Sequence, residues 1–135
     1  MTDLVLDSSA FVYATTVYTD DARELRKRIA ASTCHVPHLA DAEVGSVLRR
    51  QELAGDLSAD ECLTALHSLK HLVDNRYPAI GPLADAAWQL RGAITFYDAL
   101  YVALAANLGV PLVTMDARLS RAPGVTCAVE VVGQP

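Results

Sequence analysis

The sequence contains few cysteines and no motif that would pair them. Its three cysteines, Cys34, Cys62 and Cys127, form no CxxC pair, which favours reduced thiols over a disulfide framework or a zinc knuckle. It also lacks a Ser/Gly/Pro-rich linker, a low-complexity tract and an internal repeat. These absences argue against a disordered chain or a solenoid, and 135 residues suffice for one domain with its own core.

No segment is typical of a membrane span or a secretion signal. The uncharged run at 99–115 is divided by Asn107, Gly109 and Pro111 into a helix, a turn and a short strand. The first residues, MTDLVLDSS, include no basic leader and only a short apolar stretch. We therefore expect a cytoplasmic protein that does not bind a membrane.

The apolar pattern alternates between short runs typical of strands and one-sided stretches typical of helices. Ser58 and Glu61, for example, form a capping-box pattern before an amphipathic stretch. Strands that alternate with helices indicate parallel βαβ units, so we predict an α/β fold. The predicted strands are 4–6, 34–36, 77–80, 112–114 and 126–132, and the predicted helices are 22–31, 39–51, 58–72, 83–93 and 97–108. A further helical turn is expected after Asp7.

Three acidic residues stand beside the predicted strands at one end of the sheet. Asp7 ends the first strand and Asp116 follows the strand at 112–114. The helix at 97–108 reaches that strand through a short turn, so the two run antiparallel and Asp98 arrives near the level of Asp116. In parallel sheets this carboxyl edge is where ligands bind.

Glu43 is the fourth acid that we expect at this edge. It lies within the apolar stripe of the helix at 39–51, where an inward-pointing carboxylate needs a partner. The other three acids also have ordinary explanations, since Asp7 and Asp116 suit a helix cap and a turn, and Asp98 suits a capping box. The convergence of all four on one edge favours a functional site.

Four neighbouring carboxylates repel one another unless a cation compensates their charge. Oxygen ligands without cysteine or an obligatory histidine favour a hard ion, Mg²⁺ or alternatively Mn²⁺. Such an ion activates a bound water and neutralises a phosphate oxygen, which indicates metal-dependent hydrolysis of a phosphodiester.

The net charge of −5 argues at first against a nucleic-acid substrate. Once the four clustered acids are assigned to a metal, however, the rest of the chain is nearly neutral. Arg49 and Arg50 on one predicted helix, and Arg118 and Arg121 after the last acid, are candidates for phosphate contacts. The alternative for these arginines is a solvated face.

The aromatic residues Trp88, Tyr97 and Tyr101 are assigned to the core. Base stacking is the alternative for them.

Three stretches together resemble the PIN domain, and more narrowly the VapC-type toxins of bacterial toxin-antitoxin pairs. They are VLDSSAFV at 5–12, VPHLADAEVGSVLRR at 36–50 and FYDALYVALAANLGVPLVTMDARL at 96–119. The resemblance covers almost the whole chain. It implies one PIN domain over residues 1–135, with three α/β/α layers and a central parallel sheet in the order 3-2-1-4-5.

The same resemblance implies a Mg²⁺-dependent endoribonuclease that cuts structured RNA, chiefly tRNA or ribosomal RNA. It carries the family's four acidic positions, as catalytic residues and metal ligands, onto Asp7, Glu43, Asp98 and Asp116. Asp41 is a rival for the second position, but it lies at the edge of the apolar stripe.

Supporting groups and partners are also implied by the resemblance. A hydroxyl residue beside the first acid corresponds to Ser8 or Ser9, and a threonine two residues before the last acid corresponds to Thr114. The family further implies a homodimer and a cognate antitoxin, whose groove would involve the helices at 39–51 and 58–72.

Two other functions remain open from the sequence. Phosphohydrolases of other α/β families pair a late lysine with the phosphoryl group, whereas this chain has only Lys27 and Lys70. Haloacid-dehalogenase-like members also place a second aspartate where Ser9 stands. The second alternative is a non-catalytic PIN-like module that keeps its acids for a protein partner.

Overall fold

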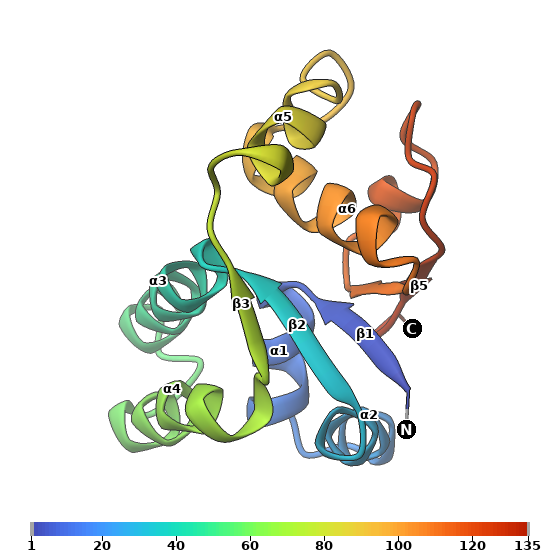
Figure 1. Ribbon diagram of the computed structural model, residues 1–135. Helices are drawn as coiled ribbons and strands as arrows, with labels where there is room; N and C mark the ends of the chain where they lie inside the picture. The colour runs from blue at the N-terminus through green and yellow to red at the C-terminus, as the bar shows by residue number, and fades with distance from the viewer. Residues whose placement is uncertain (1, 135) are drawn as a thin grey trace.

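A computed structural model describes residues 2–134 and contains a five-stranded parallel sheet (Figure 1). The strands are β1 (Asp3–Leu6), β2 (Thr33–Pro37), β3 (Asn75–Tyr77), β4 (Leu112–Thr114) and β5 (Val129–Val131). Every neighbouring pair is parallel, in the order β3-β2-β1-β4-β5. The predicted α/β class and strand order are confirmed.

Helices cover both faces of the sheet. They are α1 (Ser8–Thr16), α2 (Asp20–Ala30), α3 (Leu39–Leu53), α4 (Ala59–Leu72), α5 (Pro82–Trp88) and α6 (Phe96–Leu108), with a short 3₁₀ helix, η1 (Ala117–Ser120). The helices α2, α3 and α4 pack with α1 on one face, whereas α5 packs on α6 against the other. Figure 1 shows α3 beside α4 along one flank of the sheet. None of the helices in residues 2–134 has the length and hydropathy that crossing a membrane requires.

The core lies on both sides of the two central strands. The β1 residues Leu4, Val5 and Leu6 are at most 1% exposed, as expected for a parallel strand covered on both faces. In α6, every residue from 99 to 105 is buried. The uncharged run in this part of the chain is therefore core.

Local signals fix the ends of the helices that frame the sheet edge. The Ser58 hydroxyl accepts from the Glu61 amide at 3.1 Å and the Glu61 carboxylate accepts from the Ser58 amide at 3.0 Å, so the predicted capping box is present. Helix α6 begins after Thr95 and ends at Gly109, whose φ of 68° is the left-handed conformation that glycine adopts readily. The chain then turns back directly into β4.

Three predicted boundaries were wrong. The strand predicted at 77–80 ends at Tyr77, because Pro78 has no amide hydrogen to extend the ladder. The helix predicted at 83–93 ends at Trp88 and continues as tighter turns. The strand predicted at 126–132 covers only β5, which pairs solely with β4 at the edge of the sheet.

The aromatic residues divide between core and surface. Tyr101 is 2% exposed, which confirms its assignment to the core. Trp88 and Tyr97 are 55% and 60% exposed, so their assignment to the core was wrong. They lie at the end of α5 and in the first turn of α6.

Candidate active site

Asp7 is the most tightly held of the predicted site residues. It follows β1 directly and caps α1, with its Oδ1 accepting from the Ala10 amide at 3.0 Å and from the Ser9 hydroxyl at 2.7 Å. The Thr114 hydroxyl, at the end of the adjacent strand β4, donates to Oδ2. The carboxylate is therefore fixed from both strands, and Asp7 is only 9% exposed.

Glu43 points from α3 toward the same edge. Its Oε1 accepts a hydrogen bond of 2.6 Å from the Tyr101 hydroxyl of α6 and one of 3.5 Å from the Ser8 hydroxyl. The inward carboxylate thus finds the polar partners that its position requires. Because Tyr101 is buried on the opposite layer, this contact joins α3 to α6 across the sheet edge.

Asp98 and Asp116 lie on the two segments that flank β4. The Asp98 amide donates to the Thr95 hydroxyl at 3.2 Å in the first turn of α6. Asp116 caps η1, and its amide donates to the Thr114 hydroxyl at 3.0 Å. Thr114 therefore links the first and the last of the four acids.

The charges of the four acids act on one another. Burial, as the main cause, raises the pKa of Asp7, and the charge of Asp98 raises it further. Burial likewise raises the pKa of Glu43, to which the charges of Asp98 and Asp7 add. The pKa of Asp98 is raised by burial and by Asp116. The structure therefore brings the four predicted acids into one electrostatic cluster, which we call the acid cluster.

Asp116 differs from the other three acids because a cation neutralises it. Arg118 contacts its carboxylate through Nη2 at 2.6 Å and through Nε at 3.0 Å. These hydrogen bonds hold the pKa of Asp116 below its usual value. The ion pair is exposed on the arginine side, where the side chain of Arg118 is 80% accessible.

The acid cluster contains oxygen donors and no ready-made cage. Among residues 2–134, no three His, Cys, Asp or Glu side chains lie close enough together to surround one metal ion. The pKa values of Asp7, Glu43 and Asp98 are nevertheless raised, mainly by burial and in part by the charge of a neighbouring acid in the acid cluster. A cation among them would relieve the repulsion between these charges.

Asp41, the rival of Glu43, has a structural partner. Its carboxylate accepts from Arg76 Nε at 2.7 Å and from Arg76 Nη2 at 3.0 Å. This bidentate pair joins α3 to β3 and occupies both carboxylate oxygens of Asp41. The arrangement supports Glu43 as the second acid.

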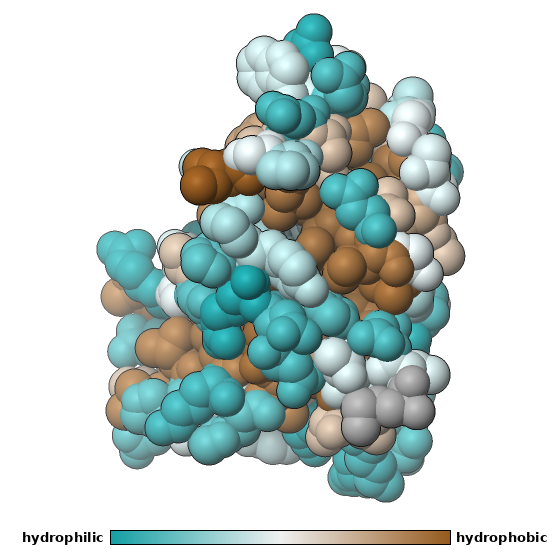
Figure 2. Space-filling view, in the orientation of Figure 1, coloured by the Kyte–Doolittle hydropathy of each residue, from teal (hydrophilic) through white to brown (hydrophobic). Residues whose placement is uncertain are grey.

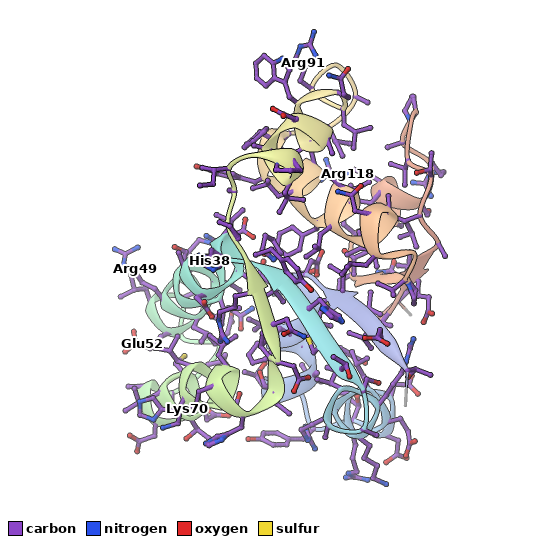
Figure 3. The ribbon with its side chains drawn as sticks, viewed as in Figure 1. His38, Arg49, Glu52, Lys70, Arg91 and Arg118 are labelled. Carbon is purple, nitrogen blue, oxygen red and sulfur yellow. The ribbon has the colours of Figure 1, made fainter. Side chains whose placement is uncertain are left out.

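The four candidate phosphate-binding arginines lie in two separate regions. Arg118 and Arg121 line a cavity that Asp98 also borders. Arg49 lines an apolar groove between α3 and α4, and Arg50 is exposed on α3. Figure 3 shows Arg49 on the flank of α3, well apart from Arg118.

Two residues at the site were not predicted from the sequence. Tyr101 follows Asp98 by three positions on α6, and this spacing places both residues on one helix face. It could have been found from that spacing. Arg91, which lines the cavity with Arg118, lies in the turns after α5, where no periodic pattern indicates its direction.

Comparisons with known proteins place the chain in a family. The sequence profile of the PIN domain matches residues 4–125. The chain is 46% identical to Ribonuclease VapC1 of Mycobacterium tuberculosis over 132 residues, which cover 98% of this chain and 99% of that protein. Ribonuclease VapC9 of the same organism is 41% identical over 129 residues, covering 96% and 98%.

Solved structures share the fold at lower identity. The VapBC2 structure from Rickettsia felis, bound to a DNA fragment from its promoter, matches with a TM-score of 0.71 and 16% identity over 97% of this chain and 99% of the other. A VapBC-5 structure from Mycobacterium tuberculosis matches with a TM-score of 0.62 and 21% identity over 98% of both chains. The chain therefore belongs to the PIN domain family and, within it, to the VapC-type proteins.

Proposed function

We propose that this protein is a Mg²⁺-dependent endoribonuclease toxin that a VapB-type antitoxin neutralises. The observation that carries the proposal is the placement of four acids, residues 7, 43, 98 and 116, at one edge of the sheet, where Thr114 contacts both Asp7 and Asp116 and Ser8 contacts Glu43. Relatives named ribonucleases support RNA as the substrate. We propose tRNA or ribosomal RNA as its target, because the family resemblance implies structured RNA.

The chemistry of the acid cluster fits a hard divalent ion. Its donors are carboxylate oxygens, with hydroxyl groups from Ser8, Ser9 and Thr114 as neighbours. Mg²⁺ binds through one or two carboxylates and keeps several waters, so it does not need a cage of three protein ligands. Mn²⁺ has similar preferences and is the alternative.

In the proposed mechanism, Asp7, Glu43, Asp98 and Asp116 would hold the ion, one or two of them by direct coordination and the others through its waters. A divalent ion held there would lower the pKa of a bound water and neutralise charge on the scissile phosphate. The chain itself supplies orientation, because Ser9 and Thr114 hold the carboxylate of Asp7. Fixed ligands of this kind lower the cost of reaching the reactive geometry.

Proton transfer is assigned to a carboxylate whose pKa is raised. A general base works best when its pKa approaches the working pH. Burial raises the pKa of Asp98, which also borders the cavity beside the acid cluster. We therefore propose that a carboxylate oxygen of Asp98 takes the proton of the attacking water.

The antitoxin is proposed to bind at the groove between α3 and α4. This groove has a volume of about 350 Å³ and is lined mainly by apolar side chains. Leu53, Leu63 and Leu66 are 66%, 50% and 38% exposed beside it, and Figure 2 shows hydrophobic surface along this flank. An apolar helix face suits such a groove.

Mapping of cleaved RNA ends tests the proposed reaction. Total RNA is incubated with the wild type, with Asp98→Asn and with Asp56→Asn, which removes an exposed acid outside the acid cluster. We expect new 5′-phosphate ends from the wild type and Asp56→Asn in Mg²⁺. EDTA or Asp98→Asn should abolish them. Equal cleavage by Asp98→Asn and the wild type would remove Asp98 from the mechanism.

A further inference from the structure

A cavity of about 620 Å³ lies beside the acid cluster. Its walls come from the turns after α5, from the start of α6 and from the segment after β4. Arg91, Arg118 and Arg121 line it together with Asp98. In Figure 3, Arg91 lies at the tip of the molecule beyond α5, and Arg118 lies below it beside α6.

Positive charge dominates this cavity. Within residues 2–134, neither Arg91 nor Arg121 forms an ion pair, whereas Arg118 is paired with Asp116. Arginine presents a planar fork of donors that matches phosphate oxygens. Among the described residues, the walls therefore include two arginines that form no ion pair and one that is paired with Asp116 of the acid cluster.

Arg91 is held in a defined position. Its guanidinium carbon lies 4.9 Å from the centroid of the Trp88 ring, and its Nη1 donates to the Trp88 carbonyl at 3.0 Å. Trp88 in turn packs edge-on against Phe96, with ring centroids 6.5 Å apart. A side chain stacked in this way loses less conformational freedom when it binds a phosphate.

Asp98 belongs to both the cavity and the acid cluster. It borders the cavity, and its charge acts on the carboxylates of Asp7 and Glu43. An RNA strand that lies in the cavity therefore lies next to the acid cluster. The volume of the cavity falls within the range of about 300–1,000 Å³ that is typical of ligand pockets. It can take up a group the size of a nucleotide, and a base-paired double helix cannot insert such a group.

We propose that this cavity binds the sugar-phosphate backbone of single-stranded RNA next to the bond that is cut, with Arg91 and Arg121 contacting the phosphates that flank it. This inference rests on the proposed ribonuclease function and adds a substrate-positioning site to it. Recognition of an unpaired strand also agrees with the way proteins read loops and bulges of folded RNA.

Binding of RNA in the absence of cleavage tests the inference. The full-length wild type, Arg91→Gln, Arg121→Gln and Lys70→Gln are titrated, in EDTA, against a fluorescein-labelled single strand of about 12 nucleotides and against its duplex. Anisotropy gives the affinity at several salt concentrations. Lys70 is exposed on α4 and lies far from Arg91, so Lys70→Gln controls for the loss of one charge (Figure 3).

Each cavity variant should bind the single strand about 5-fold more weakly at 0.1 M salt, because one phosphate contact contributes a slope of about −0.7 to the logarithmic salt dependence. The slope itself should become shallower by about 0.7. We expect Lys70→Gln to match the wild type, and the duplex to bind more weakly than the single strand. Thermal melting of each variant confirms that it is folded.

Three results would overturn the inference. The first is that the wild type does not bind the single strand, and the second is that it prefers the duplex. The third is that the cavity variants have the same affinity and salt slope as Lys70→Gln. Cleavage is measured separately, so the two proposals fail independently. Weaker binding by the arginine variants without any cleavage by the wild type would refute only the nuclease, whereas cleavage with unchanged binding would refute only this site.

Discussion

The cavity beside Asp98 and the groove between α3 and α4 are both open to solvent, but charged side chains line the cavity and apolar side chains line the groove. The cavity has three arginines and borders the acid cluster. The groove is lined by Leu48, Leu63, Leu66 and other apolar residues, with Arg49 and Glu52 at its margin. Figure 3 shows Arg49 and Glu52 on one flank of the molecule and Arg118 on another.

This difference separates two kinds of binding. Removing apolar surface from water lowers the free energy of the system, so the groove favours a protein partner with an apolar face. Unpaired guanidinium groups favour a polyanion, whose counterions they release. Since the two regions lie on different elements, substitutions should remove one kind of binding without the other.

Among these substitutions, Asp7→Asn should most strongly separate RNA cleavage from antitoxin binding. Asparagine can still cap α1, but it removes a charged ligand from the acid cluster. We expect RNA cleavage to fall by at least about 10³-fold, since a lost contribution of about 4 kcal/mol to the transition state has that effect. Binding of the antitoxin, measured by calorimetry, should not change. A parallel loss of both would mean that the two regions are not separate.

Leu66→Asp should have the reverse pattern. A charge in the groove should weaken antitoxin binding by at least about 30-fold, as removal of an interface anchor does. Leu108→Asp is the matched control, because Leu66 and Leu108 are both 38% exposed and Leu108 lies at the end of α6. RNA cleavage by both variants should equal that of the wild type. Unchanged antitoxin binding by Leu66→Asp would place the partner elsewhere.

Tyr101→Phe should act on the acid cluster alone, and more moderately. Its hydroxyl donates to Glu43 at 2.6 Å and lowers the pKa of that carboxyl. Without this donor the pKa of Glu43 rises, so the acid limb of the cleavage profile should move to higher pH. The Mg²⁺ concentration for half-maximal activity should increase about 10-fold, as when a ligand loses its orienting partner. An unchanged pH profile would show that Glu43 does not depend on Tyr101.

Asp98→Asn should stabilise the metal-free fold slightly. Its pKa is raised by burial and by the charge of Asp116, so the ionised form is disfavoured in the folded state. Because Asp98 is only partly buried, screening limits the gain to about 0.5–1 kcal/mol at neutral pH. The gain should disappear as the pH falls through the pKa of Asp98, since the neutral acid repels nothing. Urea unfolding in EDTA at several pH values measures it, and a constant difference at every pH would contradict this origin.

Much of the site could be predicted from the order of elements along the chain, because parallel strands end at the same edge of a sheet. Asp7 and Asp116 follow neighbouring strands, and a short turn at Gly109 folds α6 back along β4. These constraints are local, so the sequence predicted that Asp98 and Asp116 would lie near one another, as their interaction shows.

Other parts depended on contacts between distant segments. The apolar stripe favoured Glu43 over Asp41, but no local pattern indicates that Arg76 of β3 reaches Asp41. Arg91 is likewise directed by its stacking on Trp88, in turns without periodicity. The exposure of Trp88 could not be predicted either. The sequence does not reveal which aromatic side chains the neighbouring elements leave exposed.

The hydrogen bond between Thr114 and Asp7 joins residues that are 107 positions apart in the chain. At a synthesis rate of about 5–20 residues per second, some 5–20 s separate their emergence. A nascent or prematurely terminated chain therefore lacks the far side of its own proposed nuclease centre. The four acids can therefore come together only after β4 and Asp116 have been translated.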